Sequence, residues 1–254
     1  MAGHNKWSKI KHRKAQVEKK KTRLWSKISR ALMVAARNGG PDPTTNLSLR
    51  YAIDEARYGN MPRDTIERAI KKGAGAGDTT SFETVRYEGY APGGIAVVVD
   101  ALTDNRTRTI VDVRNTFNDY SGNVGASGCV AYMFQPRGQI LVSGKALTED
   151  RVMEIALEAG ALDVQPAGED EDEGTRSFVI LSEVGAFGQV RDAAESAGLL
   201  IEDAQLTMIP DSTTAVSSDV AKQILDLVDA LEDLDDVQKV YTNADIGADV
   251  GDAG

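Results

Sequence analysis

The residues of this sequence best suited to a chemical task lie near its N-terminus, and the task is binding a polyanion. The first 30 residues hold eleven lysines and arginines against one acid, Glu18. Trp7 lies among them, where its ring could stack on a base of a nucleic acid. Because each basic side chain can neutralise one phosphate, the segment predicts nucleic-acid binding. The candidate binding residues of this arm are His4, Lys6, Trp7, Lys9, Lys11, His12, Arg13, Lys14, Lys19, Lys20 and Lys21.

The first dozen residues show no helical periodicity, which predicts an arm that is flexible until it binds. The pattern then changes, because Leu24, Ile28 and Ala35 recur at three- and four-residue steps that mark one stripe of a helix. The same steps bring three basic residues onto a neighbouring stripe. The alternative for the arm is that Trp7 docks on the protein and the lysines form a solvated tail. The helix adds Arg23, Lys27 and Arg30 to the candidate binding residues.

The chain separates its charge between two regions. Its 254 residues carry a formal net charge of −10, yet residues 1–75 contain 18 basic and 6 acidic side chains. The remaining residues hold 11 basic and 33 acidic side chains. Such an asymmetry presents one positive region to an anionic partner, while the acidic remainder is repelled by that partner.

The composition excludes several classes of protein. No apolar run approaches the roughly 20 residues that cross a bilayer, so no membrane partner is expected. The basic start lacks the apolar core of a secretory signal. Cys129 is the single cysteine, and His4 and His12 are the only histidines, which leaves little material for a disulfide, a zinc site or a histidine-based catalytic triad. We expect a reducing, cytoplasmic compartment.

A second candidate site lies in the run Thr103–Thr109. It places Arg106 and Arg108 at a predicted junction between a strand and a helix, where free backbone N–H groups favour a phosphate. An equally good alternative is a capped helix, with Asp104 as the cap and the arginines facing solvent. We include Arg106 and Arg108 among the candidate nucleic-acid-binding residues, where they would extend the basic surface of the arm and the first helix.

Three acids near this run suggest a different chemistry. Asp100, Asp104 and Asp112 could form a two-metal phosphodiesterase site. However, a cap role explains Asp104, and Asp112 lies two helical turns further on. His4 and His12 lie in an arm too mobile to hold a catalytic geometry. We therefore expect no catalytic residue, no metal and no cofactor.

The elements that position these residues are predicted from periodicity and from glycine and proline. Three helices, separated by breaks at residues 38–43 and 60–62, form a basic helical domain with its arm over residues 1–77. The glycine-rich string that follows the third helix lacks the ending of a phosphate-binding loop, so it predicts a hinge. The second and third helices enlarge the positive surface with Arg50, Arg57, Arg63, Arg68, Lys71 and Lys72.

The rest of the chain predicts two domains that mix helices and strands. Residues 78–134 contain two strands, a helix and a further strand at Val130–Phe134. Residues 135–210 follow the order β-α-β-β-α-β of a ferredoxin-like domain and contain 5 basic and 15 acidic side chains. A helix and a strand in residues 211–243 complete the middle domain, so the acidic domain is inserted in it, and residues 244–254 predict a disordered tail.

The predicted fold class is therefore α+β. It comprises an N-terminal basic three-helix domain followed by two α/β-sandwich, ferredoxin-like domains, the third inserted in the second.

Four separated segments resemble one known family. They are Met1–Lys14 (MAGHNKWSKIKHRK), Asn60–Gly73 (NMPRDTIERAIKKG), Tyr87–Gly94 (YEGYAPGG) and Leu102–Thr109 (LTDNRTRT). Through these segments the chain resembles the YebC/PmpR family, to which mitochondrial translational activators of cytochrome c oxidase synthesis also belong. The resemblance covers nearly the whole chain and implies three domains, a cytoplasmic location and no catalytic activity. The sequence departs from the family pattern at Ala91, where glycine is common, and in the acidic loop after Gly168.

Together these observations predict a non-enzymatic, nucleic-acid-binding regulator of gene expression. The resemblance favours a DNA-binding transcriptional regulator. An arm and a helix rich in lysine suit structured RNA equally well, so a ribosome-associated translation factor that binds rRNA is the alternative. In either case the acidic inserted domain could contact a basic protein partner.

Overall fold

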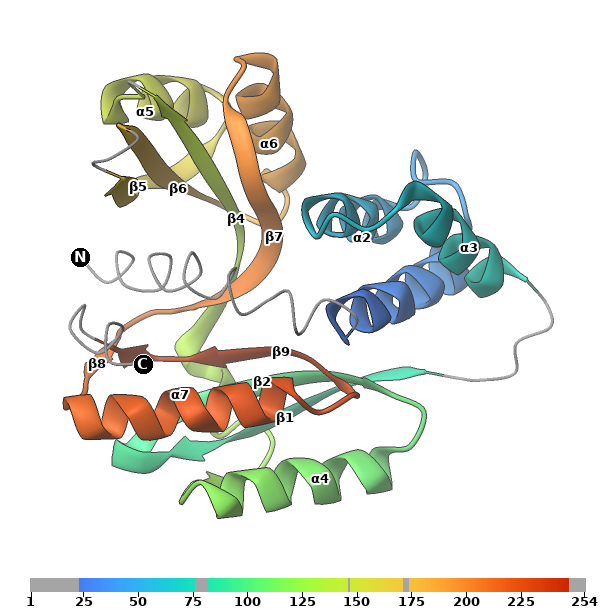
Figure 1. Ribbon diagram of the computed structural model, residues 1–254, viewed down its shortest axis with the longest axis vertical. Coiled ribbons are helices and arrows are strands. Elements are labelled where there is room, and N and C mark those ends of the chain that lie inside the picture. Colours follow the sequence, from blue (N-terminus) through green and yellow to red (C-terminus); the bar gives the residue numbers. More distant parts are fainter. Residues whose placement is uncertain (1–22, 76–81, 146, 171–173, 247–254) are drawn as a thin grey trace. The chain divides into compact units, whose positions relative to one another are not determined.

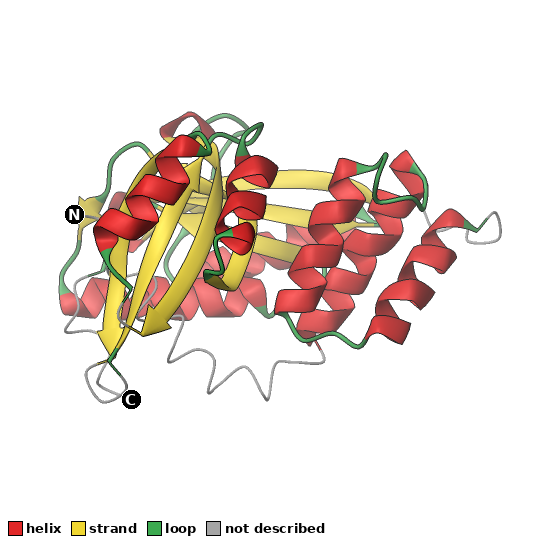
Figure 2. Ribbon diagram, turned by 90° about the horizontal axis from the view of Figure 1, so that it is seen from above, coloured by secondary structure: helices red, strands yellow, loops and turns green. Residues whose placement is uncertain are grey.

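The computed structural model describes residues 23–75, 82–145, 147–170 and 174–246 (Figure 1). The chain divides into two compact units. The described part of the smaller unit is residues 135–209, and the larger unit takes the described residues of 19–134 and 210–254. The predicted α+β class is confirmed, since the chain contains both helices and antiparallel sheets (Figure 2). Along the chain, an all-helical segment precedes the sheets. The further division of the larger unit into a helical and a middle domain stays a prediction.

Three helices form the N-terminal part of the larger unit: residues 23–39, α2 (Leu47–Tyr58) and α3 (Arg63–Ala74). Each turns an apolar stripe toward a shared core, in which Leu32 and Leu49 are fully buried. The polar and basic residues lie on the outer faces, as the helical periodicity predicts.

Asn46 fixes the turn between the first helix and α2. Its Oδ1 accepts a hydrogen bond from the backbone N–H of Leu49 at 3.1 Å, which caps α2. Its Nδ2 donates to the carbonyl oxygens of Ala35 at 2.7 Å and Gly40 at 2.8 Å. One buried amide therefore satisfies the free backbone groups at the end of one helix and the start of the next.

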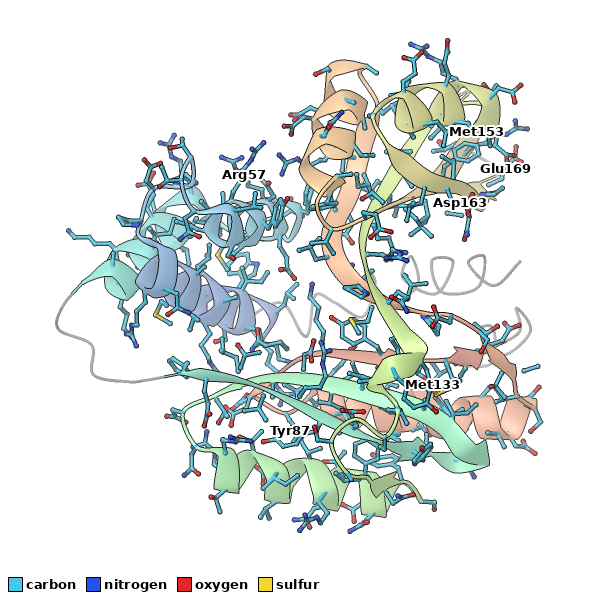
Figure 3. All side chains as sticks on the ribbon, turned by 180° about the vertical axis from the view of Figure 1, so that it is seen from behind. Arg57, Tyr87, Met133, Met153, Asp163 and Glu169 are labelled. Atoms are coloured by element: carbon cyan, nitrogen blue, oxygen red, sulfur yellow. The ribbon has the colours of Figure 1, made fainter. Side chains whose placement is uncertain are left out.

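The second part of the larger unit is a four-stranded sheet in the order β3-β1-β2-β9. Helices α4 and α7 pack against each other and share one apolar core with the sheet. Tyr87 of β1 lies in this core, between the sheet and α4 (Figure 3). The elements are β1 (Glu83–Ala91), β2 (Ile95–Thr103), α4 (Arg106–Asp119), β3 (Asn123–Val124), α7 (Ser218–Glu232) and β9 (Val237–Thr242).

The strand predicted at Val130–Phe134 is wrong, because its first residues form the 3₁₀ turn η2 (Ala131–Met133). The buried carboxylate of Glu88 on β1 takes up backbone N–H groups that a sheet ladder would need. Burial raises the pKa of Glu88, but the hydrogen bonds from the backbone lower it by more, so the pKa lies below its ordinary value. The donors are Gly128 at 2.6 Å, Val130 at 2.8 Å and Ala131 at 2.7 Å.

The smaller unit has the strand order β5-β6-β4-β7, with neighbouring strands β4/β6 and β5/β6 antiparallel. Two helices between these strands complete the β-α-β-β-α-β order of a ferredoxin-like fold. Strand β5 extends through Asp170, so Glu169 and Asp170 belong to a strand and not to a loop. The elements are β4 (Phe134–Lys145), α5 (Glu149–Glu158), β5 (Ala161–Asp170), β6 (Thr175–Ser182), α6 (Phe187–Ser196) and β7 (Leu200–Pro210).

The start of the predicted disordered tail is structured. Strand β10 (Ala244–Asp245) pairs in parallel with β8 (Thr214–Ala215). Asn243, which is buried just before β10, accepts a hydrogen bond from the backbone N–H of Ala96 at 2.9 Å. Residues 247–254 of the predicted tail lie outside the described residues.

Gly73 provides a test of how closely the helices of the N-terminal part pack. A Cβ at this position would overlap the backbone of the first helix, lying 2.6 Å from Cα of Met33. We expect Gly73→Ala to lower the free energy of unfolding by about 1–3 kcal/mol, as overpacking does. In an open helix the same change stabilises by about 1 kcal/mol, so the sign of the effect is diagnostic.

Urea denaturation of the full chain measures this effect. Gly75→Ala is the matched control, since its nearest heavy atom is a carbonyl oxygen at 3.3 Å and its φ of −77° suits alanine. If Gly73→Ala were as stable as Gly75→Ala or more so, the close approach of the two helices would be wrong.

Candidate nucleic-acid interface

Most of the residues that the sequence suggests for nucleic-acid binding precede residue 23. Their arrangement lies outside the described residues, and their role stays a prediction. They are His4, Lys6, Trp7, Lys9, Lys11, His12, Arg13, Lys14, Lys19, Lys20 and Lys21.

Arg23, Lys27 and Arg30 lie on one side of the first helix, on successive turns, as predicted. We call these three residues the cationic stripe. Each contacts the segment where α7 ends and leads into β9, residues 232–236. This segment contains Glu232, Asp233, Asp235 and Asp236, and we call it the acidic turn.

The three contacts reach different residues of the acidic turn. Arg23 Nη1 lies 3.1 Å from Oδ1 of Asp233, and Lys27 Nζ donates a hydrogen bond to the carbonyl oxygen of Glu232. Arg30 Nη1 donates to the carbonyl oxygen of Asp235 at 2.7 Å and lies 3.2 Å from Oδ1 of Asp236. Carbonyl groups at the C-terminal end of α7 carry the negative end of the helix dipole, which favours cations there.

Lys27 is half-buried, as is Arg30. Burial lowers the pKa of its ammonium group, and the nearby acids Glu232 and Asp233 act in the opposite direction. The attraction of these acids therefore offsets part of the free-energy cost of burying the charged lysine.

Asp236 is the last residue of the acidic turn, and its side chain contacts three elements: the first helix, β2 and α4. Its Oδ2 accepts hydrogen bonds from Arg108 Nη2 at 2.7 Å and from Thr103 Oγ1 at 3.1 Å. Thr109 Oγ1 lies 2.7 Å from the same oxygen, while Oδ1 faces Arg30. Burial raises the pKa of Asp236, but the bonds from Arg108 and the two threonines lower it by more, so the pKa lies below its ordinary value.

The second candidate site is likewise occupied by acids of the same chain. Arg106 Nη1 lies 3.8 Å from Oε2 of Glu83, and Arg108 bridges Asp104 at 2.8 Å and Asp236. Hydrogen bonds to these two carboxylates raise the pKa of Arg108. The cap of α4 is Asn105, whose side chain accepts from the backbone N–H of Arg108, and not Asp104 as predicted.

Four of the five described candidates therefore pair with a carboxylate of the chain, and Lys27 donates to the backbone carbonyl oxygen of Glu232. The sequence did not predict the pairs of the stripe, because the acidic turn follows it by roughly 200 residues: Arg30 is separated from Asp235 by 205 residues and from Asp236 by 206. The signal that could have found the turn is its composition, four acids in five residues directly after an amphipathic helix.

The outer faces of α2 and α3 carry a further group of exposed basic side chains. Arg57 lies on α2 with 70% of its side chain exposed (Figure 3), and Arg63 on α3 is 90% exposed. Their partners Asp54 and Glu67 lie three and four residues away on the same helix. Such exposed pairs contribute little and yield readily to another anion. Arg68, Lys71 and Lys72 are exposed on α3 as well.

Two of the three acids considered for a metal site, Asp100 and Asp104, pair with arginines. Arg86 donates two hydrogen bonds to the carboxylate of Asp100, at 2.6 and 2.8 Å, and Asp104 pairs with Arg108. In the described ranges, no three histidine, cysteine or acidic residues come together as a metal ion requires. Cys129 is half-buried, and burial raises the pKa of its thiol. None of the helices in the described part of the chain is long and apolar enough to cross a membrane.

Comparison with known proteins gives consistent matches over nearly the whole chain. Residues 5–76 match the family described as TACO1/YebC protein N-terminal domain, and residues 82–244 match TACO1/YebC second and third domain. Similar relatives include probable transcriptional regulatory proteins of Desulforapulum autotrophicum, 46% identical over 100% of both chains, and of Proteus mirabilis, 47% identical over 98% of this chain and 97% of the relative. The crystal structure of a conserved hypothetical protein from Aquifex aeolicus is similar with a TM-score of 0.81 and 46% identity, over 92% of this chain and 93% of that chain.

The hydrogen bonds of Asp236 predict a specific dependence of stability on pH. We expect Asp236→Asn to lower the free energy of unfolding at pH 7 by about 2–3 kcal/mol, because two arginines lose a shared buried carboxylate. The native pKa lies below the ordinary 3.8, so the carboxylate stabilises the fold above that value and loses its effect as the pH falls through the native value.

Urea denaturation of wild type and variant between pH 7 and about pH 3 measures this loss. The difference between the two proteins should shrink in the acidic part of this range. Asp233→Asn is the control, since its side chain is 45% exposed and its pair with Arg23 should contribute less than about 1 kcal/mol. A difference that stays constant down to the lowest pH would contradict the assigned role of the charge.

Proposed function

Because the chain belongs to the TACO1/YebC family, we propose that it is a non-enzymatic regulator of transcription that binds DNA through its basic N-terminal region. The observation that carries this proposal is the separation of charge, with 18 basic and 6 acidic residues in the first 75. A separation of this size favours a polyanionic partner and speeds encounter with it. The names of the relatives, probable transcriptional regulatory proteins, support the regulatory role.

The structure suggests which part of the helical segment faces DNA. Arg57 on α2 and Arg63 on α3 pair with acids of their own helix, and phosphates can replace those partners. The arm before residue 23 would add the larger share of phosphate contacts. Such contacts orient a protein on DNA without reading its sequence.

We also propose that the protein acts in the cytoplasm and that its acidic inserted domain contacts a basic protein partner.

The proposal predicts a steep dependence of binding on salt. Six to eight phosphate contacts give a slope of about −5 to −7 for log affinity against log salt concentration on duplex DNA. Fluorescence anisotropy with a labelled duplex of mixed sequence measures this slope for the full chain. Removing residues 1–21 should make it much shallower. A slope shallower than about −2 for the intact protein would contradict the proposal.

A single exposed lysine refines the test. Lys71→Ala on α3 should reduce the slope by about 0.9, the share of one phosphate contact. Lys222→Ala is the matched control, because Lys222 is an equally exposed lysine on α7, outside the proposed surface. Equal slopes for the two variants would remove α3 from the interface.

The same assay with a structured RNA of equal length separates DNA from RNA. Co-sedimentation of the intact protein with ribosomal particles, lost on removal of residues 1–21, would instead assign the basic region to rRNA. If the intact protein stays at the top of the gradient and shifts duplex DNA, the transcriptional role is supported.

A further inference from the structure

We propose that the acidic turn competes with nucleic acid for the cationic stripe, so that part of the basic surface is covered until a polyanion displaces the turn. This inference rests on the proposed function and concerns the regulation of the same site. The stripe is Arg23, Lys27 and Arg30, and the turn is residues 232–236; both lie in the larger unit.

The turn offers the stripe the same kind of acceptors as a phosphate backbone. Arg23 meets a carboxylate oxygen of Asp233 at 3.1 Å. Lys27 and Arg30 donate to the backbone carbonyl oxygens of Glu232 and Asp235. Guanidinium and ammonium groups bind phosphate oxygens through equivalent charge-assisted hydrogen bonds. The two partners therefore compete for the same donors.

The spacing of the contacts supports competition over an incidental encounter. The three cations are separated by four and three residues, which places them on one line along the helix. Each finds an oxygen acceptor within the same five-residue turn. A complete stripe is thus covered by one short segment of the chain.

The two ion pairs between the stripe and the turn differ in exposure, so the more exposed pair, Arg23–Asp233, should separate first. The Arg23–Asp233 pair has side chains 56% and 45% exposed, whereas those of Arg30 and Asp236 are 20% and 11% exposed. Exposed pairs are weak and are screened by salt, so Arg23 is the first member available to a phosphate. Asp236 has further donors in Thr103 and Arg108, so it stays in place when Arg30 leaves it.

Lys27 is the member of the stripe whose interaction would strengthen most if a phosphate replaced the acidic turn. Lys27 is half-buried, and its ammonium group donates a hydrogen bond to the neutral backbone carbonyl oxygen of Glu232. A phosphate would supply a full negative charge to the same donor. The covered state therefore holds its central cation with an incomplete partner, which favours exchange when a polyanion arrives.

The test is a variant that weakens the turn but keeps Asp236. Glu232→Gln, Asp233→Asn and Asp235→Asn are combined in the full chain, and binding to the labelled duplex is measured by anisotropy. Asp112→Asn, Asp119→Asn and Asp226→Asn are combined as the matched control, because they remove the same charge from exposed positions on α4 and α7. We expect the turn variant to bind about tenfold more tightly than wild type, and the control within about twofold of wild type.

Asp233→Asn alone provides a second variant that leaves the buried contacts of the turn intact. Its side chain is 45% exposed, so the fold should be retained, and we expect binding about two- to threefold tighter than wild type. Thermal unfolding of each variant checks that the proteins compared are folded.

Three results would overturn the inference. The turn variant could bind DNA no more tightly than the control variant, which would mean that the loss of negative charge alone explains any gain in affinity. It could bind like wild type, or more weakly, which would make the turn a support for the interface. The proposed function is judged separately: it fails if neither wild type nor the turn variant binds duplex DNA or RNA, whereas tight binding by the turn variant alone supports both ideas.

Discussion

A carboxylate buried beside two arginines is stable only while every oxygen has a donor, and Asp236 meets this condition. One oxygen faces Arg30 of the first helix, and the other takes Arg108 of α4 and the hydroxyl groups of Thr103 and Thr109. Desolvating such a charge is costly, so the contact holds only when all three elements are in place. The positions of the first helix and the end of α7 within the larger unit depend on this condition.

The same contact changes how the basic surface should be viewed. A count of lysines and arginines treats every one as available to an anion, but the structure divides them into two classes. Arg23, Lys27 and Arg30 have partners far along the chain, whereas Arg57 and Arg63 have partners on their own helix that are easily replaced. Net charge sets the long-range attraction, while local pairing decides which residues make contact.

The sequence predicted the class of fold and most elements because their signals are local. Helical periodicity and Pro62 located the three N-terminal helices, and the order of strands and helices predicted the ferredoxin-like topology of the smaller unit. Errors arose where a distant group overrides local preference. Val130–Phe134 has the composition of a strand, but the carboxylate of Glu88, some 40 residues earlier, bends its start into a turn.

The candidate site shows the same limit. Periodicity placed the cationic stripe on one side of a helix, which is a local property. The acidic turn that covers it lies in the last fifth of the chain, and no pattern within a short window connects the two. Asn105 replaced Asp104 as the cap of α4 for a related reason, since Asp104 is drawn into a pair with Arg108.

The smaller unit is inserted between β2 and β9 of the sheet in the larger unit, and this affects when the parts of the larger unit are synthesised. The backbone N–H of Asp211 donates to the carbonyl oxygen of Met133 at 2.9 Å, so the two crossing points of the insertion are joined. A doubling of loop length costs only about 0.6 kcal/mol in closure entropy, so the insertion burdens the pairing of β2 with β9 very little at equilibrium. During synthesis, however, the acidic turn leaves the ribosome roughly 200 residues after the cationic stripe. A nascent chain therefore carries its cationic stripe uncovered until the residues of the turn have been made.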